Sequence, residues 1–189
     1  MQGPLTELPK DLPKPEDDGR ASHLVGQQLP SIKLCSTSGA EIDLTTFGGT
    51  IVLFAYPMTG EPGKALPTDW VSIPGAAGCT LESCGFRDHY DELTELGCHI
   101  FGLSTQQQDV QAEAKERLGL QFDILSDYDM EFTRSLKLPT MSPDGIAMIK
   151  RITLICNDGV ISHVFYPIFP PDTHADEVVA WIQQMKQEA

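Results

Sequence analysis

Two of the five cysteines, Cys79 and Cys84, differ from the others because they lie close together at the expected start of a helix. A loop rich in proline and glycine precedes them, and Phe86, Tyr90 and Leu93 follow at helical spacing. A thiol at a helix start faces unpaired backbone N–H groups and the positive end of the helix dipole, and both favour the thiolate. We therefore expect Cys79 to be a nucleophile with a lowered pKa.

Cys84 lies five residues after Cys79, which puts the two thiols on different faces of an intact helix. A disulfide between them requires Cα atoms within about 7 Å, so the first turn or two of the helix would have to unwind. A zinc site is disfavoured, since no evident second Cys/His pair accompanies the two thiols. Taken alone, the Cys-x4-Cys spacing leaves open both a redox-active pair and two unconnected structural thiols.

The other three cysteines, Cys35, Cys98 and Cys156, stand inside or beside apolar stretches. A free cysteine in such a setting usually behaves as a small buried hydrophobe, and we expect all three to be buried. An odd number of cysteines in a chain without a secretory pattern argues against a structural disulfide framework.

The overall charge excludes several partners. The 189 residues carry 27 acidic and 13 basic side chains, a net charge of −14, and the lysines and arginines are scattered singly. Such a chain repels polyphosphates, so nucleic acid and anionic membrane surfaces are not expected partners. The longest apolar run, residues 51–56, is far short of the roughly 20 residues that span a bilayer.

The chain is predicted to consist of a leader and one domain. Residues 1–20 are polar and rich in proline, and we expect them to form a mobile leader. They show neither a signal-peptide nor a transit-peptide pattern, which favours a cytoplasmic location. Residues 21–189 are long enough to form a single domain with its own core.

Alternating strand and helix patterns fill this domain. Nearly continuous apolar runs predict strands at residues 50–56, 99–103, 152–156 and 161–165. Helical spacing follows Cys84, recurs before Gly119 and returns at the end of the chain, while Asn157-Asp158-Gly159 marks a hairpin turn. These elements predict an α/β domain with a mixed central sheet flanked by helices. The order is that of a thioredoxin-like fold, although periodicity alone does not separate it from other α/β layers.

Two segments carry motifs in a fixed order. The first, residues 51–92, contains a strand ended by Pro57, a loop, Gly78-Cys79-Thr80, Cys84 and Phe86-Arg87-Asp88. The second contains Arg151-Ile152-Thr153-Leu154-Ile155 and then Asp158-Gly159-Val160-Ile161. Together they resemble a peroxiredoxin, most closely the Q type, which is also called bacterioferritin comigratory protein. The likeness extends from about His23 to the last helix.

The resemblance implies a thiol-dependent peroxidase that reduces hydrogen peroxide or organic hydroperoxides. Cys79 would be the peroxidatic cysteine and become a sulfenic acid, which Cys84 would convert into an intramolecular disulfide. Thioredoxin or a glutaredoxin-like dithiol donor would then reduce this disulfide. Arg151 would stabilise the thiolate and polarise the peroxide, because a guanidinium donates several hydrogen bonds and stays charged. The resemblance implies no metal, haem, flavin or other cofactor, and a local resolving cysteine favours a monomer.

Other interpretations of the same residues stay open. A thioredoxin-like disulfide reductase is one, although its usual Cys-x-x-Cys spacing is absent. A non-enzymatic redox sensor that switches through the Cys79–Cys84 disulfide is another, and a peroxidase fold with lost activity is a third. Arg151 could instead form a salt bridge at the end of a strand. Turnover separates an enzyme from a sensor, since a sensor is oxidised once and then changes its partner binding.

The chain departs from the peroxiredoxin pattern before the first cysteine. The family usually places a Thr or Ser three residues before the peroxidatic cysteine and a Pro four residues earlier still, whereas Ala76 holds the former position here. Pro57 lies much further upstream, so we interpret residues 60–78 as an insertion in the active-site loop. Thr59 is then the best candidate for the missing hydroxyl. Thr68 and Ser72 are its rivals, and the site could work without one.

The inserted stretch also contains Trp70. In one interpretation Trp70 lines the peroxide entrance or favours a bulky organic hydroperoxide. In the other it only pins a long loop to the core. Long loops in compact domains are frequently functional, so residues 60–78 are a candidate lid.

Overall fold

The structure is a computed structural model that describes residues 7–189. Its strands are β1 (Lys33–Ser36), β2 (Glu41–Asp43), β3 (Thr50–Ala55), β4 (Cys98–Ser104), β5 (Asp123–Ser126), β6 (Thr140–Met141), β7 (Met148–Ile149), β8 (Ile152–Asn157) and β9 (Val160–Phe165). Its α-helices are α1 (Cys79–Asp88), α2 (Tyr90–Glu95), α3 (Gln108–Leu118), α4 (Glu131–Leu136) and α5 (His174–Glu188). Short 3-10 turns connect several of these elements, among them η2 (Trp70–Ser72) and η4 (Pro171–Thr173).

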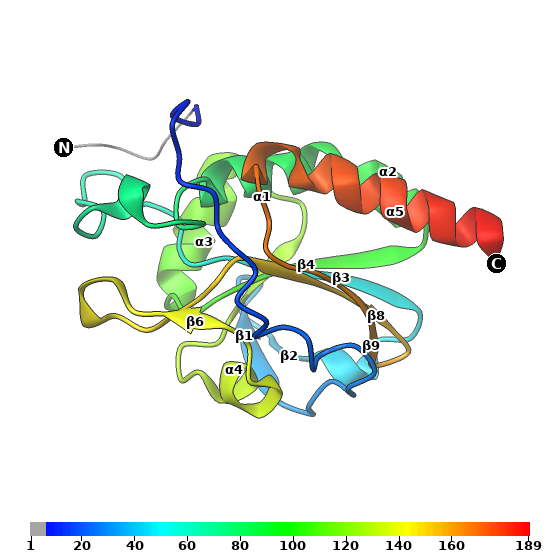
Figure 1. The fold of residues 1–189 in the computed structure, drawn as a ribbon. Coiled ribbons are helices and arrows are strands. Elements are labelled where there is room, and N and C mark those ends of the chain that lie inside the picture. The colour runs from blue at the N-terminus through cyan, green and yellow to red at the C-terminus, as the bar shows by residue number, and fades with distance from the viewer. Residues whose placement is uncertain (1–6) are drawn as a thin grey trace.

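Seven strands form one mixed sheet in the order β2-β1-β5-β4-β3-β8-β9 (Figure 1). The central strand β3 pairs in parallel with β4 and antiparallel with β8, and β4 pairs in parallel with β5. Strands β8 and β9 form the predicted antiparallel hairpin. The observed topology confirms the predicted α/β fold with a mixed central sheet.

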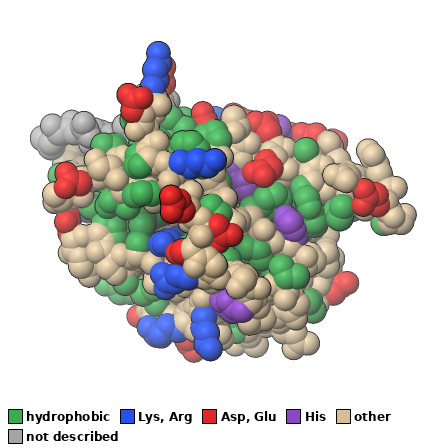
Figure 2. All heavy atoms as spheres, viewed as in Figure 1, with side chains coloured by type: hydrophobic (Ala, Val, Ile, Leu, Met, Phe, Trp, Pro, Cys, Tyr) green, Lys and Arg blue, Asp and Glu red, His purple; other side chains and the backbone are tan. Residues whose placement is uncertain are grey.

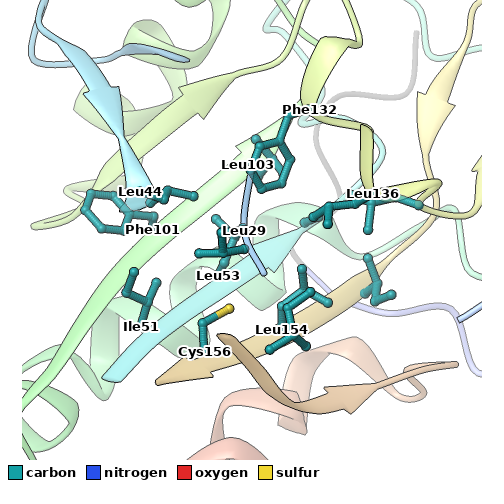
Figure 3. Packing of buried hydrophobic residues seen from close by; sticks show 14 of the residues in the cluster. Leu29, Leu44, Ile51, Leu53, Phe101, Leu103, Phe132, Leu136, Leu154 and Cys156 are labelled. Atoms are coloured by element: carbon teal, nitrogen blue, oxygen red, sulfur yellow. The ribbon is translucent and has the colours of Figure 1, made fainter. Parts of the chain in front are cut away.

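Two apolar layers cover the sheet because its buried strands direct alternate side chains to opposite faces. On one face, Phe54 and Val52 of β3 pack with apolar side chains of α1, α2 and α5, and these helices lie together above the sheet in Figure 1. On the other face, Leu53 of β3 and Leu154 of β8 pack with Phe132 of α4 (Figure 3).

The helices follow the apolar spacing with two local differences. The pattern Phe86, Tyr90, Leu93 spans two helices instead of one, because the backbone leaves helical geometry at His89. Helix α3 ends, as expected, at Gly119, which takes up a left-handed conformation with φ 64°. The break after α1 leaves the helix that carries both cysteines only ten residues long.

Residues 7–20 lie along the domain and contact it (Figure 1). Asp18 accepts hydrogen bonds from Lys150 Nζ and Tyr166 Oη, both at 2.8 Å. Leu12 packs against the buried cluster that contains Trp70. The mobility expected of residues 1–20 stays a prediction, and residues 1–6 lie outside the described residues.

The expected burial of the three outlying cysteines is wrong in one case. Cys98 and Cys156 are buried, but Cys35 is exposed. Strand β1 alternates exposed and buried side chains, and Cys35 belongs to the exposed set. Alternation along a four-residue strand is too short a signal to fix the register from the sequence.

Charge is mixed on the face seen in Figure 2, where acidic and basic side chains are interspersed. None of the helices between residues 7 and 189 is long and apolar enough to cross a membrane.

Candidate active site

Cys79 is the first residue of α1, as the sequence predicts, and its side chain is only 4% exposed. The preceding residue, Gly78, has φ 106°, which favours glycine. A Cβ atom there would collide with Pro171 at the start of η4. The turn that delivers Cys79 to the helix start therefore depends on glycine for two separate reasons.

Arg151 brings a positive charge directly to the thiol. It lies just before β8, the strand that pairs with β3, and its side chain is buried. Its Nη2 donates to Cys79 Sγ at 3.2 Å and to the carbonyl oxygens of Ala76 and Ala77, both at 3.1 Å. The structure therefore brings together the two residues predicted to carry the chemistry.

Glu82 completes this cluster and was missed by the sequence analysis. Its carboxylate is fully buried and forms an ion pair with Nη1 of Arg151. Glu82 lies three residues after Cys79, so both side chains project from the same side of α1. That spacing was visible in the sequence, but the burial of a carboxylate at this position was not.

Opposing effects act on the pKa values of Cys79 and Glu82 in this cluster. Burial raises the pKa of the Cys79 thiol, the Glu82 carboxylate raises it further, and the Arg151 charge with hydrogen bonds from Arg151 and the Met58 backbone lowers it. Burial also raises the pKa of Glu82 to about 7, although Arg151 acts in the opposite direction. The lowered pKa expected for Cys79 is therefore wrong for this structure, because the thiol is buried at the helix start. Among the groups that lower the pKa of Cys79 and so favour its thiolate, Arg151 has the largest effect.

Ala76 stands where the family pattern has a hydroxyl. In this structure its backbone carbonyl accepts a hydrogen bond from Cys79 Sγ at 3.5 Å and another from Arg151 Nη2. The backbone at this position thus contacts both Cys79 and Arg151 although its side chain carries no hydroxyl.

Pro57 and Thr59 lie on the loop that follows β3, and both are buried. The Thr59 hydroxyl donates to Gln106 Oε1 at 3.3 Å, and the two backbone groups of Thr59 also bond to the Gln106 amide. Among the described residues no hydrogen bond joins Thr59 to Cys79. Its predicted role as the replacement hydroxyl stays a prediction, and Gln106 is a second residue that the sequence analysis missed.

Cys84 lies in the middle of α1 and is partly buried. Both cysteines are free thiols, and the helix between them is intact. Burial raises the pKa of the Cys84 thiol, and the nearby Arg87 lowers it. The geometry agrees with the prediction that a bond between the two sulfurs requires α1 to open.

The inserted loop reaches the thiol. Trp70 and Leu66 line a small cavity of about 20 Å³ together with Met58, Gly60 and the residues around Cys79. Trp70 is only 5% exposed and packs with Ala76, Ala77 and Met148. The indole therefore packs in a buried cluster and also lies beside Cys79, while its role at the peroxide entrance stays a prediction.

Comparison with known proteins places the chain in a family. Residues 24–179 match the family model described as Redoxin. Peroxiredoxin Bcp of Escherichia coli K12 is 31% identical over 166 residues, covering 84% of this chain and 95% of that protein. The chloroplastic peroxiredoxin Q of Suaeda salsa is 24% identical over 161 residues, covering 85% of this chain and 68% of that protein. Peroxidoxin BcpB from Mycobacterium tuberculosis has a similar crystal structure, with 26% identity and a TM-score of 0.69 over 86% of this chain and 98% of that one.

The chain therefore belongs to the Redoxin family, and within that family to the peroxiredoxins of the Q type. Its thioredoxin-like fold agrees with the order of elements derived from the sequence.

Proposed function

We propose that this peroxiredoxin reduces hydroperoxides with Cys79 as the peroxidatic cysteine and Cys84 as the resolving cysteine. One observation carries the proposal: the sulfur of Cys79, which is buried at the start of α1, lies 3.2 Å from a guanidinium nitrogen of Arg151. A thiolate there is stabilised by a fixed positive charge and is shielded from bulk water. Peroxidase activity is the chemistry of the family to which the chain belongs.

The first step oxidises Cys79. The thiolate attacks the terminal oxygen of the hydroperoxide, so that an S–O bond forms while the O–O bond breaks. The departing alkoxide or hydroxide takes up a proton and leaves as alcohol or water, and Cys79 becomes a sulfenic acid. Arg151 donates to the oxygens as negative charge moves from sulfur onto the leaving oxygen.

The second step joins the two cysteines. The Cys84 thiolate attacks the sulfenic sulfur of Cys79, so that an S–S bond forms while the S–O bond breaks, and the departing hydroxide takes up a proton and leaves as water. Because both residues belong to the intact helix α1, the helix must unwind locally before the sulfurs meet. The break at His89 supports this step, since it separates the ten residues of α1 from α2.

Thiol–disulfide exchange closes the cycle. Thioredoxin or a glutaredoxin-like dithiol protein supplies two electrons and returns both cysteines to thiols. The chemistry needs no second subunit because the resolving cysteine lies on the same helix as Cys79, and we propose a cytoplasmic monomer. Pro57 and Thr59 belong to this proposal as residues that shape the loop opposite Cys79.

A coupled turnover assay tests the proposal. Wild-type protein with thioredoxin, thioredoxin reductase and NADPH should consume hydrogen peroxide catalytically, and Cys79→Ser should abolish consumption. Cys84→Ser should allow one oxidation of Cys79 and then stop, with a trapped sulfenic acid. Cys35→Ser is the matched control, because this exposed thiol lies on β1 and should leave turnover unchanged.

The outcomes separate the alternatives. Normal turnover by Cys79→Ser would contradict the proposal outright. Normal recycling by Cys84→Ser would assign resolution to another thiol. A single oxidation of the wild-type protein without turnover would favour the sensor, and reactivity only toward protein disulfides would favour a reductase.

A further inference from the structure

Cys84 leaves its place in α1 only when the helix that carries it opens. A helix rises about 1.5 Å per residue and an extended chain about 3.3–3.6 Å, so unwound residues need more length between the same two ends. Helix α1 holds only ten residues, and the chain leaves helical geometry at His89 immediately after it. A contact that fixes the chain at His89 therefore opposes the opening that joins Cys84 to Cys79.

The imidazole of His89 is bound on both sides. Its Nδ1 lies 3.0 Å from Glu92 Oε2 on α2, and its Nε2 lies 2.7 Å from Asp176 Oδ1 on α5. Ionised carboxylates only accept hydrogen bonds, so both ring nitrogens have to donate, and only the imidazolium has two donors. A protonated His89 thus forms an ion pair with each carboxylate. We call these three residues the His89 clamp.

The surroundings of His89 favour its positive charge. Burial lowers the pKa of His89, but the hydrogen bonds and negative charges of Glu92 and Asp176 outweigh burial and raise the pKa above its usual range. The charged neighbours on α1, Arg87 and Asp88, pair with each other. His89 lies at the C-terminal end of α1 and Asp176 in the first turn of α5, where their charges suit the helix dipoles. The clamp is therefore present below the raised pKa and weakens as the pH rises through it.

Helix α5 is a firm support for the clamp. It is fifteen residues long, and its side chains Val178 and Ala175 are buried in the apolar layer that also contains Cys79. The second carboxylate oxygen of Glu92 accepts a hydrogen bond from Gln183 Nε2 of α5 at 2.8 Å. The clamp therefore connects the end of the short helix α1 to a helix that is anchored in the core.

We propose that the His89 clamp sets the rate at which Cys84 reaches the oxidised Cys79. The inference rests on the proposed function and makes His89 a positioning residue for its second step. Because the clamp holds the end of α1 against α5, it stabilises the intact helix relative to the opened one. Loss of the clamp should raise the population of opened α1, in which the two sulfurs can meet.

The clamp also influences a competing oxidation. While α1 stays closed, a second hydroperoxide can react with the sulfenic acid of Cys79. Its terminal oxygen forms an S–O bond while the O–O bond breaks, alcohol or water leaves, and Cys79 becomes a sulfinic acid that thiol–disulfide exchange does not reverse. Slow opening of α1 favours this product, whereas fast opening favours the Cys79–Cys84 disulfide.

Single-turnover oxidation separates the two steps. Reduced protein is mixed with hydrogen peroxide, quenched with N-ethylmaleimide in denaturant and mapped by mass spectrometry. Loss of the free Cys79 thiol reports the first step, and loss of the free Cys84 thiol reports disulfide formation. At pH 6, His89→Gln should raise the first-order rate constant of disulfide formation about three- to tenfold, since partly exposed ion pairs contribute modestly. The rate constant of the first step should stay unchanged, and the sulfinic fraction at excess peroxide should fall.

The pH profile is a readout that a merely structural role of His89 would not move. Glutamine donates to one carboxylate, as neutral imidazole does, so His89→Gln resembles the deprotonated clamp. The ratio of the variant to the wild-type rate constant of disulfide formation should be largest at pH 6 and approach one towards pH 10. Ionisation of Cys84 accelerates this step in both proteins and cancels in the ratio. A ratio of one at pH 6, or one that does not change with pH, would overturn the proposal.

Two more variants serve as partner and control. Asp176→Asn removes the other side of the clamp, and adding it to His89→Gln should increase the rate constant little further, because both substitutions break the same ion pair. Fully additive effects would contradict the clamp. His99→Gln makes the same chemical change at an exposed histidine of β4 and should leave both rate constants unchanged.

Amide hydrogen exchange of the reduced proteins tests the clamp without any peroxide. At pH 6, residues 80–88 should exchange several times faster in His89→Gln than in the wild type, because the helix opens more often. Equal exchange in the two proteins would contradict the clamp whether or not the protein is a peroxidase. Faster exchange in the variant, together with a wild type that does not consume peroxide, would instead place the error in the proposed function.

Discussion

Replacing Arg151 by methionine removes the guanidinium while keeping an unbranched apolar stem of similar reach. In the wild-type structure Nη2 donates to Cys79 Sγ at 3.2 Å in a buried site. A hydrogen bond to a charged group contributes about 1.5–3 kcal/mol, and each pKa unit corresponds to about 1.4 kcal/mol. The pKa of Cys79 should therefore rise by about one to two units, and its thiolate fraction at neutral pH should fall about 10- to 100-fold.

The same substitution leaves Glu82 buried without its cation. Breaking a buried ion pair from one side costs about 3–5 kcal/mol of stability. The loss is limited because burial already raises the pKa of Glu82 to about 7, so the carboxyl is readily protonated once Arg151 is gone. A double variant, Arg151→Met with Glu82→Gln, removes the uncompensated charge and should regain stability without regaining reactivity.

Alkylation of Cys79 by iodoacetamide across pH 5–10 reads out the thiolate directly, with the other thiols separated by peptide mapping. Lys150→Met is the matched control, because Lys150 precedes Arg151 in the chain but pairs with Asp18 at the surface. The control should alkylate like the wild type. A folded Arg151→Met protein that alkylates Cys79 within about threefold of the wild type at pH 7 would refute the assigned role and return Arg151 to a structural salt bridge.

Three further variants probe the surroundings. Glu82→Gln should increase Cys79 alkylation severalfold at pH 8, because ionised Glu82 raises the pKa of Cys79, and an unchanged rate would contradict that coupling. Desolvation lowers the pKa of the buried His174 to about 3, so the folded state disfavours protonation of this residue. The wild type should therefore lose about 2 kcal/mol of stability as the pH falls from 8 to 5, because the unfolded chain takes up the proton. In urea titrations, His174→Gln should remove that part of the loss. Leu12→Ala should lower the free energy of unfolding by about 1 kcal/mol, whereas no change would mean that residues 7–20 are not docked in solution.

The sequence predicts four of the seven strands of the central sheet, β3, β4, β8 and β9, because their signals are local, whereas the short strands β1, β2 and β5 were missed. Buried strands such as β3 and β8 are continuous apolar runs, and the turn at Asp158-Gly159 determines the hairpin between β8 and β9. The position of Cys79 at the helix start was likewise visible, since a glycine precedes it and helical spacing follows.

The parts of the site that the sequence could not supply depend on burial and on distant contacts. Glu82 reads as an ordinary surface residue of a helix, yet the fold places it against Arg151. The rise in the pKa of Cys79 has the same origin, because desolvation at a helix start cannot be derived from the start alone. Gln106 follows the C-terminal end of β4 and forms hydrogen bonds with Thr59, and no local sequence pattern connects these two residues.

The inserted loop illustrates a different limit. Its composition predicts a loop, but the sequence left open whether Trp70 lines the peroxide entrance or only pins the loop to the core. The contacts of Trp70 with Ala76, Ala77 and Met148, and its place beside Cys79, come from the fold and have no local sequence signal.

Mass spectrometry of the reduced protein after one equivalent of hydrogen peroxide tests the central claim most directly. The proposed cycle predicts that the intact protein loses two hydrogens and that peptide mapping places a disulfide between Cys79 and Cys84, while Cys35, Cys98 and Cys156 stay reduced. An unchanged mass, or oxidation spread evenly over all five thiols, would contradict the account, because Cys79 would then have no special reactivity toward peroxide.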